Sequence, residues 1–453
     1  MKKTKIVCTV GPSSFDEVIL RKMFREGMDC VRINTAYGSF DQYRSITRKV
    51  RELMDVPVML DIKGPEVRLR VSEDRTVEEG DFFEISFENG DIAFTHDIGE
   101  EIEIGDEIYI DNGRLKTRVV SKKSNSVVVE VLVGGLISDG KGITVPKREF
   151  NTPALTKESV RLLALAQELD IDLIALSYTR SPEDIEMIKE RLDGGDMGVF
   201  AKIESSEGLK NFQDILEVSD GVIVARGDLG LEISLERVPM AQKYIIDECN
   251  SKGIPVVTAT EMLESMIEKN SPTRAEVSDV ANAILDGTDA VMLSGETSIG
   301  KHPIDSVAVM SRIAKEVESE VDSEVGGRMS VTMSETMSKA VRRICEDMPV
   351  DKIVTLTRSG FTARMISRFR LSEAIIAVTP QEKVRRKLEL VFGVNPINLD
   401  YQDREDRIYY VVEELVSRNI LKREDTVLFA AAFRTDRKHG TNLVEVHEIE
   451  DFF

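Results

Sequence analysis

Short apolar runs alternate with amphipathic stretches from Lys5 to Ser294. Within most runs the apolar residues are consecutive, which is typical of parallel strands that are buried on both faces. The runs are Lys5–Val10, Cys30–Asn34, Val56–Ile62, Asp172–Tyr178, Gly198–Glu204, Gly221–Arg226, Ile254–Thr260 and Ala290–Ser294. Helical patterns with start signals lie between them, as in Thr156–Leu169, Pro182–Leu192, Pro239–Ser251 and Ala275–Leu285. About eight such β-α repeats predict an α/β fold built on a closed (β/α)8 TIM barrel.

The stretch after Gly64 departs from this alternation of buried strands and helices. It alternates apolar and polar positions and carries turn signals at 111–113 and 124–126. Strands are expected at Asp81–Phe87, Glu107–Ile110, Leu115–Ser121 and Val127–Val133. A connection this long rarely lacks structure of its own. We therefore expect an all-β domain, residues 65–147, inserted after the third barrel strand as a lid over the catalytic face.

The last segment predicts a separate α/β domain. Strands are expected at Lys352–Leu356, Ala374–Val378 and Thr426–Ala431, and helices at Ser334–Glu346, Thr362–Phe369 and Asp406–Ser417. The expected division is therefore a barrel made from residues 1–64 and 148–328, the lid between them, and a C-terminal α/β domain at 329–453.

The composition and net charge of the chain argue against several classes of partner. The chain has 453 residues, is 42% hydrophobic and 31% charged, and has a net charge of −21. A duplex-binding protein normally carries a basic face, so this balance argues against nucleic acid and acidic membrane surfaces as partners. With no apolar run long enough for a bilayer and no signal-peptide pattern, a cytoplasmic location is expected. The four cysteines are too far apart in sequence to suggest a disulfide framework or a zinc site.

Almost every apolar run ends in charged residues, polar residues or glycine. In a parallel barrel these ends collect at the carboxyl-end face, where barrel enzymes carry out their chemistry. A loop start or a helix cap explains any one of them equally well, but so many charged ends together favour a site.

Lys202 and Glu204 lie two positions apart at one of these ends, so they face the same side. A carboxylate there could hold a divalent metal, with Asp228 from the next strand end as the second carboxylate. The ammonium could stabilise negative charge on a substrate. A structural Lys–Glu ion pair is the alternative, and spacing alone does not separate the two.

Other segments have the chemistry of anion sites. Arg32 and Arg68 could present guanidinium forks to phosphate or carboxylate oxygens, or could be surface arginines. The glycines of Arg226–Gly230 let backbone N–H groups approach an anion, or simply make a tight turn. Thr357–Thr362, at a strand-to-helix junction, could bind an anion or cap a helix. A basic group near the end, Arg434, Arg437 and Lys438, could complete that pocket or lie in a solvated loop.

At this point the chain resembles the pyruvate kinase family along nearly its whole length. The resemblance lies in long, ordered motifs, which are Thr4–Ser14, Leu60–Arg68, Ala201–Ser205, Ser219–Gly230, Ala259–Met266, Pro272–Glu276 and Met292–Thr297. It implies a phosphotransferase that moves the phosphoryl group of phosphoenolpyruvate onto ADP, giving pyruvate and ATP in the last step of glycolysis.

The resemblance also implies roles for single residues. Glu204 and Asp228 would ligate Mg²⁺ or Mn²⁺. Arg32 and Lys202 would contact the phosphoryl group, and Lys202 would also stabilise the enolate.

The remaining substrate contacts follow from the same motifs. Gly227 and Thr260, beside Asp228, would bind the carboxylate end of the substrate, and Thr260 would take part in protonating the enolate. Asn34, Arg68 and Lys141 would face the nucleotide phosphates, with Lys141 supplied by the lid.

A monovalent-cation site is implied at Asn34, Asp61 and the carbonyl of Ile62. Here Ala36 stands where the family usually has a serine ligand, whereas Glu66 is typical of K⁺-dependent members. We leave K⁺ dependence open.

In the C-terminal domain the resemblance points to a phosphorylated allosteric effector at Thr357, Arg358, Ser359, Gly360 and Thr362. Phe361 stands where sugar-bisphosphate-activated members often have arginine, so the effector's identity and existence are open. The family is typically a homotetramer.

Two alternatives compete with the kinase. A metal-dependent aldolase or lyase acting on a pyruvate enolate would share Arg32, Lys202, Glu204 and Asp228 but would not need the lid. A metabolite sensor without catalytic activity would not need the intact set of Lys202, Glu204, Asp228 and Thr260.

Overall fold

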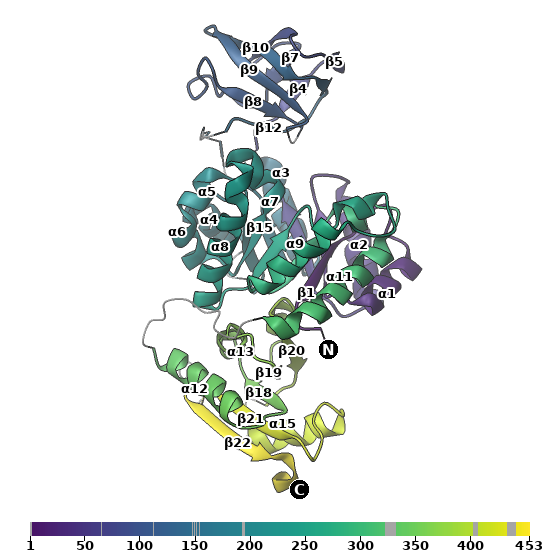
Figure 1. Ribbon diagram of the computed structural model, residues 1–453, viewed down its shortest axis with the longest axis vertical. Coiled ribbons are helices and arrows are strands. Elements are labelled where there is room, and N and C mark those ends of the chain that lie inside the picture. The colour runs from purple at the N-terminus through teal and green to yellow at the C-terminus, as the bar shows by residue number, and fades with distance from the viewer. Residues whose placement is uncertain are drawn as a thin grey trace.

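The structure, a computed structural model, shows three bodies stacked along one long axis (Figure 1). It describes residues 2–64, 66–111, 113–146, 148, 150, 152–153, 155–192, 195–321, 332–401, 406–432 and 441–453. A β body lies at one end, a barrel ringed by helices in the middle, and an α/β body at the other end.

The middle body is a closed barrel of parallel strands in the order β1-β17-β16-β15-β14-β13-β3-β2. Its strands are β1 (Lys5–Thr9), β2 (Cys30–Asn34), β3 (Val58–Ile62), β13 (Leu173–Leu176), β14 (Gly198–Ile203), β15 (Gly221–Ala225), β16 (Val256–Ala259) and β17 (Ala290–Leu293). Nearly every strand residue is buried, which explains the continuous apolar runs. The predicted TIM barrel is confirmed, although β13 is shorter than its predicted run.

Helices cover the outside of the barrel. They are α1 (Glu17–Glu26), α2 (Phe40–Leu53), α3 (Lys157–Glu168), α4 (Pro182–Arg191), α5 (Ser206–Lys210), α6 (Phe212–Val218), α7 (Arg226–Glu232), α8 (Val238–Lys252), α9 (Arg274–Leu285), α10 (Gly295–Ser298) and α11 (Pro303–Val317). Their starts follow local chemistry: Thr156 caps α3 by accepting from the Ser159 N–H, and Thr273 and Glu276 form a capping box on α9.

The inserted body leaves the barrel after β3 and has its own hydrophobic core. A seven-stranded sheet has the order β12-β8-β9-β10-β6-β7-β4, and β11 pairs with β5 beside it. The four predicted strands are present as β6 (Phe82–Ser86), β8 (Glu107–Ile110), β9 (Leu115–Lys122) and β10 (Ser126–Val133). The sequence did not reveal β4 (Leu69–Val71), β5 (Arg75–Val77), β7 (Ile92–Phe94), β11 (Gly135–Ile137) and β12 (Ile143–Thr144). Two or three residues are too few for alternation to be recognised.

The C-terminal body is a five-stranded sheet, β20-β19-β18-β21-β22, with hydrophobic clusters on both faces. Its strands are β18 (Lys352–Leu356), β19 (Ala374–Thr379), β20 (Val394–Asn398), β21 (Thr426–Ala431) and β22 (Leu443–Glu448), and its helices are α12 (Met333–Asp347), α13 (Phe361–Ser367), α14 (Glu382–Leu388) and α15 (Arg407–Ser417). Only β22 runs antiparallel to its neighbour. The sequence analysis did not predict β22, because it is an edge strand in which apolar and polar residues alternate.

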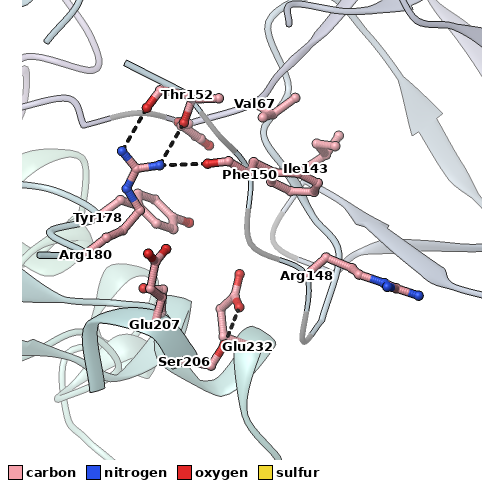
Figure 2. A pocket seen from close by; sticks show the side chains of 12 residues that line it. Val67, Ile143, Arg148, Phe150, Thr152, Tyr178, Arg180, Ser206, Glu207 and Glu232 are labelled. Atoms are coloured by element: carbon pink, nitrogen blue, oxygen red, sulfur yellow. Dashed lines mark hydrogen bonds between the residues drawn. The ribbon is translucent and has the colours of Figure 1, made fainter. Parts of the chain in front are cut away.

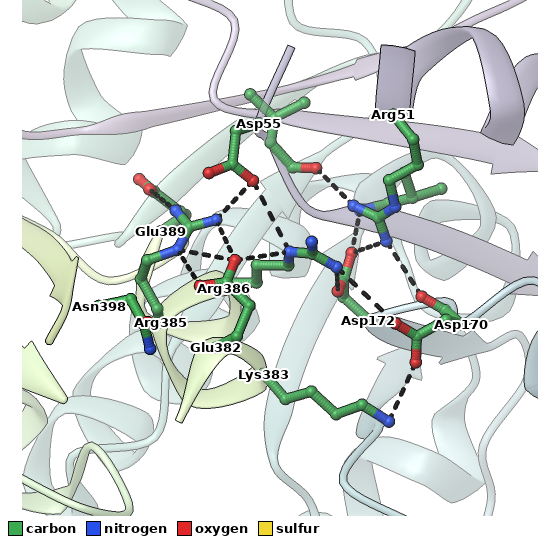
Figure 3. A network of polar contacts seen from close by, with 12 residues as sticks. Arg51, Asp55, Asp170, Asp172, Glu382, Lys383, Arg385, Arg386, Glu389 and Asn398 are labelled. Atoms are coloured by element: carbon green, nitrogen blue, oxygen red, sulfur yellow. Dashed lines mark hydrogen bonds and ion pairs between the residues drawn. The ribbon is translucent and has the colours of Figure 1, made fainter. Parts of the chain in front are cut away.

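A dense ion-pair network joins the C-terminal body to the amino-end face of the barrel (Figure 3). Arg386 on α14 lies 3.3 Å from Asp172, which also pairs with Arg51 at 2.6 Å. Arg385 lies 2.6 Å from Asp55. These contacts fasten α14 to the loops that precede the barrel strands.

Among the helices that the structure describes, none has the length and apolar character needed to cross a membrane.

Candidate active site

The carboxyl ends of β2, β3 and β14 bring a cluster of charged side chains together on the barrel face that points toward the inserted body. The Lys202 Nζ lies 2.9 Å from a Glu204 oxygen and 3.2 Å from an Asp61 oxygen. It also donates to the Ser177 hydroxyl at 2.6 Å. Both carboxylates therefore share one ammonium group.

Arg32 completes this cluster from β2. Its Nη2 lies 2.6 Å from Asp61, and its Nη1 donates to the Thr9 hydroxyl at 2.8 Å. Arg32 and Lys202 are each only 8% exposed, Asp61 is 3% and Glu204 is 1% exposed. Four buried charges in direct contact make this an ion network inside the barrel mouth.

Burial and neighbouring charges shift the pKa values of the residues in this network in different directions. Burial opposes ionisation of Asp61, but attraction to Lys202 and Arg32 prevails and lowers its pKa. Burial also opposes the charge on Lys202, yet Asp61 and Glu204 raise its pKa. For Glu204, burial is the larger effect and raises the pKa to about 7, and the negative charge of Asp228 adds to it. With Asp228 included, Asp61, Glu204 and Asp228 bring three carboxyl groups to this face against the two positive charges of Arg32 and Lys202.

Asp228 lies in the first turn of α7, immediately after β15, and is half-buried. Burial raises its pKa, and the charges of Glu66 and Asp61 act in the same direction. Its carboxylate accepts no hydrogen bond from any residue that the structure describes. A carboxylate with open oxygens beside the Glu204 carboxylate fits a divalent cation that keeps sites for water or substrate. Within the described ranges, no group of three or more histidine, cysteine or acidic side chains forms a denser metal cluster.

Thr260 follows β16 and faces Gly227. The Gly227 N–H donates to the Thr260 hydroxyl oxygen at 2.8 Å. Thr260 has a φ of 67°, which is strained for a β-branched residue. Arg226 donates to the Thr260 carbonyl at 2.8 Å and is itself paired with Asp279 at 2.7 Å. The buried Arg226 side chain therefore holds the strained backbone that presents the Thr260 hydroxyl.

Arg68 and Lys141 belong to the inserted body, where the Leu69 N–H donates to the Lys141 carbonyl. Arg68 pairs with Glu66 at 2.5 Å and donates to the Gly140 carbonyl at 2.6 Å. Lys141 pairs with Asp111 at 2.9 Å. Both cations lie together in the lid, and both have acidic partners in this conformation.

The three candidate ligands of a monovalent cation lie side by side, because Asn34 and Asp61 are partners in the β2–β3 register. The Asn34 side-chain oxygen accepts from the Ala36 N–H at 3.0 Å, and the Ile62 carbonyl accepts from the Ser177 N–H at 3.0 Å. Asp61 is bound to Arg32 and Lys202. The Asn34 side chain, the Asp61 carboxylate and the Ile62 carbonyl therefore each already accept a hydrogen bond from another protein group.

A small pocket lies between the lid and the barrel next to this cluster (Figure 2). Glu66 and Arg148 line it from the lid side, and Tyr178, Ser205 and Glu232 from the barrel side. Burial raises the pKa of Glu232 to about 7. Sequence reasoning missed Tyr178 and Glu232, although Tyr178 closes the fourth predicted strand and could have been found as another polar strand end.

Arg180 connects the two bodies at this pocket. It donates to the carbonyls of Phe150 and Thr152, both at 2.8 Å, as Figure 2 shows. These residues lie where the chain returns from the lid to the barrel. One barrel side chain thus fixes the base of the lid.

In the C-terminal body, the Thr357 hydroxyl accepts from the Gly360 N–H at 3.0 Å, and Gly360 has a φ of 78°. The Thr362 hydroxyl accepts from Thr441 at 2.9 Å. The predicted strand-to-helix junction is therefore present, between β18 and α13, and contains Arg358 and Ser359. Arg434, Arg437 and Lys438 lie outside the described residues.

Comparisons with known proteins show the family to which the chain belongs. A family model described as the pyruvate kinase barrel domain matches residues 1–307, and one described as the pyruvate kinase alpha/beta domain matches residues 335–447. The chain belongs to the pyruvate kinase family. Members of that family are phosphotransferases, so this chain is a kinase of the class whose acceptor is an enol or alcohol group.

Curated pyruvate kinases of several bacteria are similar over nearly the full chain. The protein of Clostridium perfringens is 37% identical over 99% of this chain and 100% of its own length. That of Clostridium acetobutylicum is 36% identical, with 99% of this chain and 100% of its own length covered. That of Geobacillus stearothermophilus is 37% identical over 99% of this chain and 81% of its own length.

Proposed function

We propose that this pyruvate kinase family member transfers the phosphoryl group of phosphoenolpyruvate to ADP, giving pyruvate and ATP as in the last step of glycolysis. The observation that supports this most directly is the Lys202 ammonium, buried between Asp61 and Glu204 at the barrel mouth. Such a cation can bind a phosphorylated enol and stabilise the enolate that remains after transfer.

Glu204 and Asp228 are the proposed ligands of Mg²⁺, for which Mn²⁺ could substitute. Both carboxylates have pKa values raised by burial, and the Asp228 carboxylate accepts no hydrogen bond from the residues that the structure describes. A divalent ion held there would neutralise charge on the phosphoryl oxygens.

The transfer itself needs positioning and charge neutralisation more than covalent chemistry. Arg32 and Lys202 are proposed to hold the phosphoryl group while its bond to the enol oxygen breaks and a bond to the terminal phosphate oxygen of ADP forms. The electron pair of the broken bond stays on the enol oxygen, next to the Lys202 ammonium.

Thr260 is proposed to take part in the proton step that completes the reaction. Its hydroxyl, and the Gly227 N–H that now donates to it, would turn to the substrate. The backbone of Gly227 would bind the substrate carboxylate, and the Thr260 hydroxyl would help to pass a proton to the methylene carbon of the enolate, which becomes the methyl group of pyruvate.

Asn34, Arg68 and Lys141 are proposed to bind the nucleotide phosphates. Closing the lid would exchange the Glu66 and Asp111 partners of the two lid cations for phosphate oxygens. The proposed division is a barrel of residues 1–64 and 148–328, a lid of 65–147 and an effector and oligomerisation domain of 329–453.

The finer family properties are also proposals for this chain. They are K⁺ at Asn34, Asp61 and Ile62, a phosphorylated effector at the 357–362 loop, a homotetramer and a cytoplasmic location. The engaged oxygens around Asp61 and the alanine at position 36 favour a weak K⁺ requirement.

The test is a coupled assay of pyruvate formation by the full chain with phosphoenolpyruvate, ADP and Mg²⁺, with and without K⁺. We expect turnover that requires ADP and Mg²⁺, and its loss in Lys202→Met. Lys352→Met is the matched control, because Lys352 pairs with Asp425 in the C-terminal body, far from the barrel mouth. Absence of pyruvate under all these conditions would reject the proposal.

A further inference from the structure

Tyr178 lies in the turn that follows β13, directly beside one of the proposed metal ligands. Its backbone N–H donates to a Glu204 carboxylate oxygen at 2.6 Å. Its φ of 51° is in the left-handed region, which is rare for a bulky aromatic residue. A strained residue of this kind persists only when its neighbours fix it, and such residues cluster at functional sites.

Two glycines fix this turn by allowing other backbone segments to approach closely. A Cβ on Gly64 would collide with the Ser177 carbonyl oxygen, and one on Gly208 would lie 2.5 Å from the Thr179 carbonyl oxygen. Backbone hydrogen bonds at both ends of the turn tie it to β3 and β14. The backbone of Tyr178 is therefore held in one place on the barrel face.

The Tyr178 side chain points into the small pocket between the lid and the barrel (Figure 2). Glu66 lines this pocket from the lid, and Ser205 and Glu232 line it from the barrel. The side chain is partly buried, yet its hydroxyl makes no hydrogen bond with any residue that the structure describes. The hydroxyl is therefore available to a ligand or a water molecule in the pocket.

Acidic side chains dominate the surroundings of this phenol. Burial raises the pKa of Tyr178 well above its usual value, and the charge of Asp228 acts in the same direction more strongly than that of Glu204. The charges of Glu66 and Glu232 add to this effect. A phenol keeps its proton at neutral pH even without such neighbours. The neutral hydroxyl can therefore donate to a carboxylate and accept from a second group at the same time.

A hydrated divalent ion supplies a donor of the kind that this hydroxyl can accept. Mg²⁺ usually keeps several waters, and each metal-bound water has its oxygen on the ion and its hydrogens turned outward. Outer-shell groups that bind to the inner shell of a metal orient it and raise the metal affinity. Glu204 and Asp228 supply only two carboxylates, so an ion held by them keeps waters that need such acceptors.

We propose that the Tyr178 hydroxyl accepts a hydrogen bond from a water on the divalent ion held by Glu204 and Asp228, and so acts as a positioning residue of the metal site. The same residue fixes the Glu204 carboxylate through its backbone N–H. This inference rests on the proposed metal site, and it adds a group to that site which the two carboxylates alone do not require.

Packing between the lid and the barrel is the alternative role for this side chain. Packing needs the ring and not the hydroxyl, so Tyr178→Phe separates the two roles. This variant keeps the ring, the turn and the N–H on Glu204, and it removes one oxygen atom. Tyr244→Phe is the matched control, because Tyr244 is another barrel tyrosine, exposed on α8, whose hydroxyl accepts from Gln213 at 3.0 Å.

The first measurement is Mn²⁺ binding to the full chain without substrate, by electron paramagnetic resonance. A single pH is used, since protonation of Glu204 also changes the affinity. We expect Tyr178→Phe to weaken Mn²⁺ binding by about tenfold and Tyr244→Phe to bind like the wild type. Equal loss in the two variants would overturn the inference.

The melting temperature without metal tests whether the hydroxyl is merely structural. Tyr178→Phe should melt close to the wild type, because the hydroxyl has no hydrogen-bond partner among the described residues. A marked fall in the melting temperature of this variant alone would show a structural role and would overturn the inference.

Tyrosine fluorescence gives a further readout, since the chain has 8 tyrosines and no tryptophan. Mg²⁺ should change the emission of the wild type and of Tyr244→Phe, and most of this change should be absent from Tyr178→Phe. A full Mg²⁺ signal in Tyr178→Phe would contradict the assignment.

These outcomes separate the role of Tyr178 from the proposed function. A wild type that binds no Mn²⁺ would reject the metal site and this inference together. A wild type that binds Mn²⁺ and a Tyr178→Phe variant that binds it equally well would reject only the role of Tyr178. In that case a raised KM for ADP in Tyr178→Phe would assign the hydroxyl to the nucleotide instead.

Discussion

The two ends of the barrel use buried charge in opposite ways. At the amino end, carboxylates pair directly with arginines, as where Asp172 contacts Arg51 and Arg386 and Asp289 contacts Arg370. At the carboxyl end, burial raises the pKa values of Glu204 and Asp228. Asp61 and Glu204 share the ammonium group of Lys202. The ion pairs at the amino end stabilise the fold, whereas the carboxylates at the carboxyl end are available to bind a cation.

Backbone strain follows the same division. Thr260 and Glu261 have φ values of 67° and 55° at the carboxyl end of β16. Arg226 bonds to both of their carbonyl oxygens and restrains them. Such strain persists only where the surroundings hold it, and it is typical of reactive sites.

The largest expected effect is on stability at the amino end. Asp289→Ala leaves Arg370 buried without its carboxylate and removes the acceptor of the Phe392 N–H. Breaking a buried pair in this way typically costs about 3–5 kcal/mol. Chemical unfolding of the isolated variant checks this. A loss below about 1 kcal/mol would contradict the stabilising role of this end.

The matching change at the carboxyl end should separate function from stability. Asp228→Asn should lower kcat/KM by about 10²–10³-fold, since it removes a proposed metal ligand. Without metal it should not lower the melting temperature, because the Asp228 carboxylate has no hydrogen-bond partner among the described residues and burial already opposes its charge. A large drop in the metal-free melting temperature would show that Asp228 stabilises the fold.

A smaller effect is expected from pH. The folded-state pKa of Glu204, about 7, lies above the ordinary value, so the folded protein binds a proton more tightly than the unfolded chain does. Without metal, the stability from this group is present below the ordinary carboxyl pKa and is lost as pH rises toward 7. Mg²⁺ affinity should change in the opposite sense, weakening up to about tenfold per pH unit below 7.

Titration of Mg²⁺ from pH 5.5 to 8 measures this dependence, and the melting temperature without metal checks the stability. Glu204→Gln should flatten the stability trend. A Mg²⁺ affinity that does not change with pH would argue against a protonated Glu204 in the metal-free protein.

The smallest effect is expected from the lid. Lys141→Ala should raise the KM for ADP by about tenfold, equivalent to 1.4 kcal/mol, and leave the KM for phosphoenolpyruvate nearly unchanged. Lys123→Ala is the control, because Lys123 is another lid lysine with an acidic partner, Glu84, but is exposed. Equal effects of the two changes on both KM values would remove Lys141 from the nucleotide site.

Much of the fold could be predicted because burial on both faces leaves continuous apolar runs, as at β15 and β14. The lid strands β4 and β12 escaped because three and two residues carry no readable period. β22 escaped because an edge strand with intermediate burial lacks the apolar run used to find strands.

The candidate site was predictable only in part. Lys202 and Glu204 are close in sequence and close in space. The contact of both Lys202 and Arg32 with Asp61 joins residues from three strands, which spacing along the chain cannot reveal. The contact of Arg368 with the Ser251 carbonyl was equally hidden, because it depends on how the C-terminal body packs against the barrel.

Mn²⁺ binding, measured by electron paramagnetic resonance on the wild type and on Glu204→Gln and Asp228→Asn, tests the central account most directly. The account predicts one bound ion in the wild type, tightened by phosphoenolpyruvate, and at least a tenfold loss of affinity in each variant. Equal Mn²⁺ affinity in all three proteins would contradict it.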